Sequence, residues 1–389
     1  MIWDEFFEKV IEMKKLTIVT YANFPNGEAA SVRIYAMCRM LLQTGHDVSI
    51  ICMNRQSANE WREYNGVKYY SIRSPKNDLL SRLKNVLLFK RRTAHVLKNM
   101  KEIDILMPLS IPIPALLYCE RFAKKRGIGL ITDRTEWYSP CEFKMGRFSF
   151  PYISNTLTNR CIIDRSWKVV SISRLFEEYY RGKGISTIRI PAVMVKDEVE
   201  HKKYQVNSPL RVVYAGSPAK KDSLDKIVDA FDAFESCYIK LLVYGVTLEQ
   251  FNQANKRSKR TYNNVEFKGR VSREEVLDAL STADFTTIFR DPRERFTKAG
   301  FPSKVAESMI CGVPVISNYT SDLELYLEDL SNSVIVDDYS IEAYIEALNR
   351  IAKMDPNTIE LMHEKAYLTA TECFNYSVYS EAISSFIDE

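Results

Sequence analysis

Residues 300–317 read GFPSKVAESMICGVPVIS, a pattern that predicts a loop, a short helix ended by Gly312 and a buried strand. The pattern predicts Ser303 as the N-cap of the helix, directly after Pro302. A helix start presents free backbone N–H groups and a partial positive charge. Lys304 adds a full positive charge to this first turn, which is unfavourable in an isolated helix. We therefore expect an anion to bind at this helix start.

Glu307 lies one turn further along the same predicted helix. A purely structural alternative for the segment is a capping box, which needs Glu or Gln three residues after the cap. Position 306 is alanine, whereas Glu307 is four residues after Ser303 and shares its helix face. A carboxylate there can accept hydrogen bonds from two hydroxyl groups, such as those of a ribose.

Apolar runs of strand length alternate with helical patterns along the chain, which is typical of α/β folds with parallel sheets. In the first half, strands are predicted at 16–22, 46–53, 103–108, 129–133 and 168–173, with a helix at 30–45. The alternation restarts after a polar stretch at 195–209. There, strands are predicted at 210–217, 239–245, 265–269, 284–290 and 332–337, and helices at 223–234 and 272–283.

Two successive Rossmann-like, doubly wound domains fit this pattern, the first over residues 1–200 and the second over 201–374. Ligands of such sheets bind at the carboxyl ends of the strands. We therefore expect the chemistry in the loops at 22–31, 133–142, 215–223, 290–304 and 317–323.

The composition is that of an ordinary globular protein, with 46% hydrophobic and 27% charged residues. A net charge of +4 is too small to indicate nucleic-acid binding. Eight cysteines without a Cys-x-x-Cys pair, and only four histidines, argue against a structural zinc site and fit a reducing cytoplasm. The apolar run at 105–118 contains three prolines and is shorter than the ~20 residues of a membrane span.

Four segments together resemble the retaining glycosyltransferase family 4, which has the GT-B fold of two Rossmann-like domains facing each other across a cleft. They follow one another in the family's order and spacing, at 25–51, 212–231, 265–285 and 300–317. The resemblance implies that the second domain binds a nucleotide-sugar donor and the first an acceptor. It also implies that the last helix, at 375–389, crosses back to pack on the first domain.

The family's signature is a pair of glutamates separated by seven residues, of which the second binds the ribose. The resemblance assigns this role to Glu307, while Ala299 stands in place of the first glutamate. The family binds the donor pyrophosphate with a basic pair. Its lysine corresponds to Lys221 or Lys220. Ser217 stands in place of its arginine, and Arg290 could compensate for the missing arginine. The expected donor-binding residues are Gly27, Gly216, Lys220, Lys221, Arg290, Gly300, Phe301, Pro302, Ser303, Lys304 and Glu307.

The sequence contains no Asp-x-Asp, the motif with which the other major nucleotide-sugar transferase fold commonly holds a divalent metal. We therefore expect a donor site without a metal or any other cofactor. Asp133 and Glu136 follow a predicted strand and are the candidates for binding the acceptor hydroxyl or accepting its proton. The structural alternative for both is an acidic helix start.

Residues 81–101 contain seven basic side chains, no acidic one, and an apolar stripe at helical spacing. Such a helix can lie on an anionic membrane or bind a lipid diphosphate, and its alternative role is a solvated face over the core. The basic and aromatic segment at 144–154 can border the same surface. We therefore expect a cytoplasmic protein, able to associate with the inner face of the plasma membrane.

The leading hypothesis is a hexosyl or N-acetylhexosaminyl transferase. It would move a sugar from a nucleotide-sugar, UDP-linked by expectation, to a glycan or lipid-linked acceptor in surface polysaccharide biosynthesis. Two alternatives stay open: a nucleotide-sugar 2-epimerase, and a catalytically silent GT-B subunit paired with an active partner. Ala299 and Ser217 favour the silent subunit.

Overall fold

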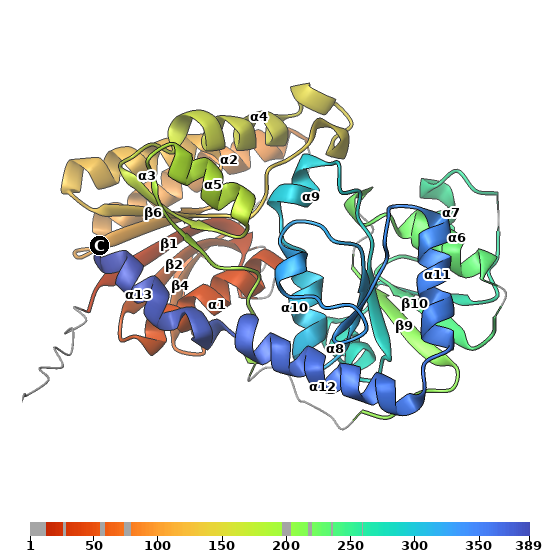
Figure 1. The fold of residues 1–389 in the computed structure, drawn as a ribbon. Helices are drawn as coiled ribbons and strands as arrows, with labels where there is room; N and C mark the ends of the chain where they lie inside the picture. The colour runs from red at the N-terminus through yellow and green to blue at the C-terminus, as the bar shows by residue number, and fades with distance from the viewer. Residues whose placement is uncertain are drawn as a thin grey trace, which may run out of the picture.

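The structure, a computed structural model, consists of two α/β domains that lie side by side (Figure 1). It describes residues 13–25, 29–54, 59–73, 79–196, 204–216, 220–234, 236–258 and 260–389. Within these ranges, no helix is both long enough and apolar enough to cross a bilayer.

The first domain is built on an eight-stranded sheet in the order β3-β4-β2-β1-β5-β6-β7-β8. Neighbouring strands are parallel, for example with Leu16 opposite Val48, except for the edge strand β3, which is antiparallel to β4. The strands are β1 (Lys15–Asn23), β2 (Asp47–Asn54), β3 (Glu60–Tyr64), β4 (Val67–Arg73), β5 (Ile105–Leu109), β6 (Gly129–Arg134), β7 (Trp167–Ser171) and β8 (Ser186–Arg189).

Helices cover both faces of this sheet, as its two buried faces require. One face packs against α1 (Ala29–Gln43) and the terminal helix α13 (Ser380–Asp388). The other packs against α2 (Leu79–Asn99), α3 (Ile113–Arg126) and α5 (Arg174–Gly182), with the short helix α4 (Phe150–Leu157) beside them (Figure 1).

The second domain has a six-stranded sheet in the order β11-β10-β9-β12-β13-β14, and every pair in it is parallel. The order reverses between β9 and β12, the point at which doubly wound sheets bind ligands. The strands are β9 (Leu210–Ala215), β10 (Ile239–Tyr244), β11 (Val265–Gly269), β12 (Phe285–Ile288), β13 (Val315–Ser317) and β14 (Ser333–Ile335).

The helices of the second domain also form two layers. One consists of α6 (Leu224–Ala233), α7 (Leu248–Ala254) and α11 (Ile341–Ala352). The other consists of α8 (Arg273–Ser281), α10 (Ser303–Ile310) and α12 (Pro356–Cys373). The short helix α9 (Arg295–Ala299) lies between this layer and the first domain (Figure 1).

The predicted class of two doubly wound, parallel α/β domains is confirmed, and the long apolar runs all form strands near the predicted positions. Strands β3, β4 and β8 were not predicted from the sequence. In β3 nearly every residue is exposed, so the strand lacks an apolar run. The single helix predicted over 375–389 is wrong in extent, because a 3₁₀ turn at Tyr376–Tyr379 precedes α13.

The chain crosses between the domains twice, and the two crossings lie side by side. The Met194 N–H donates to the Phe374 carbonyl oxygen at 2.8 Å, and the Tyr376 N–H donates to the Met194 carbonyl oxygen at 3.0 Å. After the return crossing, α13 is fixed to the first domain. His46 Nε2 lies 2.9 Å from Ser384 Oγ, and Lys14 pairs with Asp388 at 2.8 Å.

Candidate functional site

Loops from both domains meet at what we call the domain junction. It comprises residues 134–141 and 173–174 of the first domain and 290–304 and 322–324 of the second. Ser173 Oγ donates to the Ala299 carbonyl oxygen at 2.7 Å, and the Arg174 N–H donates to Asp322 Oδ2 at 2.8 Å. These loops follow strand ends β6, β7 and β12, so the carboxyl ends of the two sheets face one another here.

Two cations at the junction share one buried carboxylate. Asp222, in the turn after β9, accepts from Arg290 Nη2 at 2.8 Å and Nε at 2.9 Å, and it also pairs with Lys304 Nζ. Tyr214 donates its hydroxyl to the same carboxylate at 3.1 Å. Burial alone would raise the pKa of Asp222, but the charges of Lys304 and Arg290 outweigh it and hold that pKa well below its ordinary value. This cation cluster therefore keeps one net positive charge.

Gly216 makes room for the lysine of this cluster. A Cβ atom at position 216 would lie 2.5 Å from both Cε and Nζ of Lys304, and the backbone there has a φ of +157°. The Lys304 Nζ also lies 4.2 Å from the centre of the Tyr214 ring. Only glycine lets the Lys304 side chain cross the end of β9 this closely.

The start of α10 differs from the sequence prediction in one respect. Ser303 was predicted as the N-cap, and this is wrong: Pro302 occupies the cap position and Ser303 is the first helical residue. Pro302 has an extended backbone, and its carbonyl oxygen accepts from the Val305 N–H at 3.0 Å. No side chain caps the helix, so its first N–H groups remain suited to an anion.

The residues just before α10 have packing roles. Phe301 is buried against Tyr326 and Phe374, with ring centres 5.6 Å away in both cases. A Cβ on Gly300 would lie 3.0 Å from the Phe296 carbonyl oxygen and 3.4 Å from that of Thr135 in the first domain. Glycine at 300 thus permits close contact between the domains, and the predicted donor contacts of Gly300 and Phe301 remain predictions.

Glu307 lies in the second turn of α10 and accepts from Arg273 Nη1 at 2.8 Å. Its side chain is 19% exposed and that of Arg273, at the start of α8, is 46% exposed. This arginine partner was not predicted from the sequence. The ion pair orients the carboxylate at the surface between α8 and α10.

The structure describes the side chain of Lys221, only the backbone of Lys220, and no part of Gly27. Lys221 Nζ donates to Glu136 Oε1 at 2.7 Å, so a donor-site candidate and a catalytic candidate from different domains are in contact. Lys220 is described only in its backbone, at the start of a 3₁₀ turn. Gly27 and Ser217 lie outside the described residues.

Asp133 does not have the surroundings of a catalytic group. Its two carboxylate oxygens accept from Arg33 Nε at 2.6 Å and Nη2 at 2.9 Å, and both side chains are buried. Arg33 also donates to the Pro191 carbonyl oxygen at 2.6 Å. Asp133 therefore fastens α1 and the chain crossing to β6, which favours a structural role, and its predicted role in binding the acceptor hydroxyl or accepting its proton remains a prediction.

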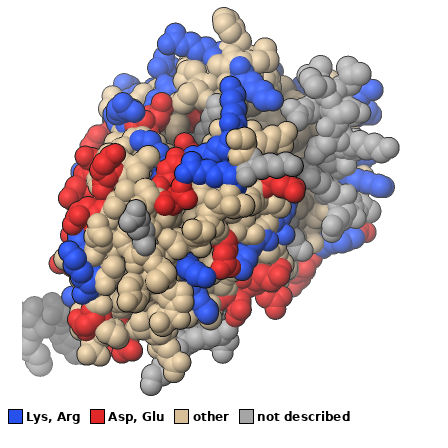
Figure 2. All heavy atoms as spheres, turned by 90° about the vertical axis from the view of Figure 1, so that its right-hand side faces the viewer, with Lys and Arg blue, Asp and Glu red and all other residues tan. Residues whose placement is uncertain are grey.

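The described ranges contain no group of three His, Cys, Asp or Glu side chains placed to share a metal ion. On the face of the second domain in Figure 2, described acidic and basic side chains are interspersed. This distribution resembles an ordinary solvated surface rather than a nucleic-acid-binding stripe.

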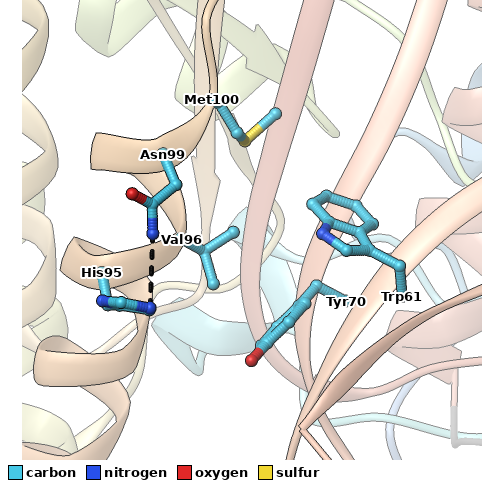
Figure 3. A pocket seen from close by; sticks show the side chains of 6 residues that line it. All are labelled: Trp61, Tyr70, His95, Val96, Asn99 and Met100. Atoms are coloured by element: carbon cyan, nitrogen blue, oxygen red, sulfur yellow. Dashed lines mark hydrogen bonds between the residues drawn. The ribbon is translucent and has the colours of Figure 1, made fainter.

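A small hollow of about 140 Å³ lies between the sheet edge and the end of α2 (Figure 3). Trp61 and Tyr70 face it from β3 and β4 with their rings 5.5 Å apart, and His95 and Asn99 face it from α2, 3.3 Å from each other. The last turn of α2 precedes the amino end of β5, so this hollow is remote from the carboxyl ends of the strands. It is not part of the candidate site.

Comparison with known proteins gives this geometry a context. Residues 196–369 match the family model described as "Glycosyl transferases group 1". This range covers the second domain, including the cation cluster and Glu307. The chain is a glycosyltransferase. No curated protein matches it in sequence.

Solved structures of similar fold cover nearly the whole chain. Sucrose-phosphate synthase from Thermosynechococcus elongatus has a TM-score of 0.76 at 12% identity, over 96% of this chain and 98% of that one. WaaG, a glycosyltransferase involved in lipopolysaccharide biosynthesis, has a TM-score of 0.67 at 16% identity, over 96% and 99%. Anabaena Alr3699/HepE, in complex with UDP and glucose, has 0.66 at 13% identity over the same shares. These likenesses establish that the glycosyltransferase has the GT-B fold.

Proposed function

We propose that this glycosyltransferase is a retaining, metal-independent enzyme that moves a hexosyl or N-acetylhexosaminyl group from a UDP-sugar. The acceptor is a glycan or a lipid-linked sugar in surface polysaccharide assembly, at the cytoplasmic face of the membrane. The observation that carries the proposal is the cation cluster of Arg290 and Lys304 beside the uncapped start of α10, with Glu307 one turn further on.

The cluster suits the diphosphate of the donor. When the sugar leaves, negative charge develops on the diphosphate, and fixed cations and helix N–H groups stabilise that charge. Arg290, Lys304 and the first amides of α10 supply both without a metal ion. Lys221 adds a third cation from the turn that contains Asp222.

Glu307 suits the ribose of the nucleotide. Its carboxylate is oriented by Arg273 and stands on the exposed side of α10, so two ribose hydroxyls can donate to it. The solved HepE structure in complex with UDP and glucose makes UDP the preferred nucleotide in this proposal. The role of WaaG in lipopolysaccharide biosynthesis favours a surface glycan as the acceptor.

The transfer step needs little from the protein beyond these contacts. The bond between the anomeric carbon and the diphosphate oxygen breaks, and the acceptor oxygen forms its bond on the same face of the sugar. The acceptor proton passes to the departing phosphate oxygen. Glu136, in contact with Lys221, is placed to orient the acceptor hydroxyl.

Calorimetric titration in EDTA tests the donor site. We expect UDP to bind without a metal, Glu307→Ala to weaken UDP but not inorganic pyrophosphate, and Lys221→Ala to weaken both. Two exposed residues, Glu342 in α11 and Lys353 directly after it, give matched controls, Glu342→Ala and Lys353→Ala, which should bind UDP as the wild type does. UDP binding that requires Mg²⁺ or Mn²⁺ would contradict the proposed metal independence.

Product analysis with a panel of UDP-sugars tests the reaction. We expect NMR to show the donor's anomeric configuration in the product. Epimer formation without an acceptor would identify the 2-epimerase alternative. UDP binding with neither transfer nor slow donor hydrolysis would favour the silent subunit. The reason to test for this outcome is that a buried alanine, Ala299, stands in place of the family's first glutamate.

A further inference from the structure

A cavity of about 270 Å³ opens at the carboxyl ends of β1, β5 and β6, on the first-domain side of the junction. Its walls are mainly apolar and come from α2, α3, α4 and the loop before α3. They include Val86, Ile111, Leu116, Phe150 and Pro151. Glu136 also lines the cavity, and its carboxylate holds Lys221 of the donor site. The cavity therefore adjoins the place where the donor sugar would react.

Arg134 is the buried cation of this cavity. It is the last residue of β6 and is only 6% exposed, and its Nε has no hydrogen-bond partner. It approaches the Tyr180 hydroxyl, a neutral group, but forms no ion pair with any acidic side chain in the described residues. The two nearest acids in sequence are already engaged, Asp133 by Arg33 and Glu136 by Lys221.

A buried guanidinium without a counter-ion is costly, and an anion that enters the cavity removes that cost. Arginine is also the side chain best suited to bind phosphate oxygens in pairs. The site therefore calls for a ligand with a negatively charged group at the floor of the cavity and apolar contacts along its walls.

The rim of the cavity continues as an exposed apolar ridge. Phe148, Phe150, Ile153 and Leu157, on and just before α4, are 81%, 59%, 41% and 42% exposed. Across the opening, the outer side of α2 exposes Leu87 together with Lys84, Lys90 and Arg91. Apolar and basic side chains at one rim suit an amphipathic anion better than a free sugar.

We propose that Arg134 binds the phosphate of a lipid-phosphate acceptor whose apolar chain leaves the cavity along α4. This inference rests on the proposed function and adds the acceptor class and the residue that recognises it. It assigns Arg134 to acceptor recognition. The sugar of the acceptor then lies toward Glu136, next to the donor.

Binding of a short soluble probe tests this with the donor site filled. In saturating UDP, we expect geranyl phosphate to bind at least tenfold more tightly than geraniol or inorganic phosphate. Arg134→Met should lose at least tenfold in geranyl phosphate affinity, and Arg134→Lys should keep part of it. The matched control is Arg121→Met, at an exposed position on α3, which should bind the probe as the wild type does. UDP titration of each variant checks that its donor site is intact.

Three outcomes would overturn the inference. One is equal probe affinity in Arg134→Met and wild type, and another is inorganic phosphate binding as tightly as geranyl phosphate. The third is Arg134-dependent capture on vesicles of phosphatidylcholine and phosphatidic acid without any binding of geranyl phosphate, since that pattern marks a general membrane site. If the wild type does not bind UDP, the proposed function fails instead, so the two failures are distinguishable.

Discussion

Lys221 and Glu136, which belong to different domains, are joined by a hydrogen-bonded ion pair of 2.7 Å at the domain junction. The carboxylate thus engages a cation that the proposed diphosphate also needs. When the donor binds, Lys221 must then either contact both the Glu136 carboxylate and the diphosphate or leave Glu136.

Glu136→Gln should bind UDP at least as tightly as the wild type while transferring sugar more slowly. The substitution removes the competing negative charge but also the group that we propose orients the acceptor. Lys221→Met should weaken UDP binding, most clearly at low ionic strength. Calorimetry with UDP and a transfer assay measure the two effects. Glu120→Gln on α3 is the control, and equal losses of UDP affinity in Glu136→Gln and Lys221→Met would contradict the competition.

Gly216→Ala should weaken UDP binding by about tenfold, or ~1.4 kcal/mol. The added methyl group would overlap the Lys304 side chain and force that cation away from the cluster. Gly182→Ala serves as the control, because nothing lies within 4 Å of a Cβ placed there. Unchanged UDP affinity in Gly216→Ala would show that the position of Lys304 does not matter for the diphosphate.

Asp222→Asn should destabilise the second domain by about 3–5 kcal/mol at neutral pH, because Arg290 and Lys304 lose a buried counter-ion. The pKa of Asp222 is lowered in the folded state from its ordinary value of 3.8. Its contribution to stability is therefore complete above about pH 4 and falls as the pH drops below that value. Urea unfolding from pH 7 to pH 3 should show that the difference in the free energy of unfolding between wild type and variant narrows only at the acidic end. If that difference stays constant down to pH 3, ionisation of Asp222 is not the source of the lost stability.

Asp133→Asn should reduce stability by about 3–5 kcal/mol, since it leaves the buried Arg33 guanidinium without its carboxylate. The double variant Arg33→Met with Asp133→Leu should recover much of that loss. Thermal unfolding measures both. In addition, kcat per folded molecule of Asp133→Asn, assayed well below its melting temperature, should stay close to wild type. A large fall in kcat with little change in stability would restore Asp133 as a catalytic residue.

The doubly wound architecture was predictable because its central strands are continuous apolar runs, as expected of strands buried on both faces. Strand β3 was not, because its side chains are exposed and only pairing with β4 defines it. At the start of α10, the charge of Lys304 and the spacing of Glu307 from Ser303 predicted an anion and ribose site, and that site stays a prediction. The cap itself was misplaced by one residue, because the backbone of Pro302 takes the cap geometry that serine usually supplies.

The partners of the site residues were beyond the sequence analysis. Asp222 directly follows Lys221 in the sequence and reads as one more loop charge, yet it lies between Arg290 and Lys304 from distant segments. Asp133 and Arg134 illustrate the same limit. Side chains alternate along β6, so Asp133 pairs with Arg33 whereas Arg134 lines the cavity. Only their positions in the strand separate a structural carboxylate from a cation without a counter-ion.

The paired crossings at Met194 and Asn375 restrict how the halves of the molecule can move relative to each other. Both covalent connections run through one seam and are bonded to each other there, so a change in backbone angle on one must be matched on the other. We therefore expect the domains to move relative to each other by a hinge rotation about one axis rather than by independent reorientation. By the same argument, we expect loops far from the seam to move furthest and residues beside it to move least.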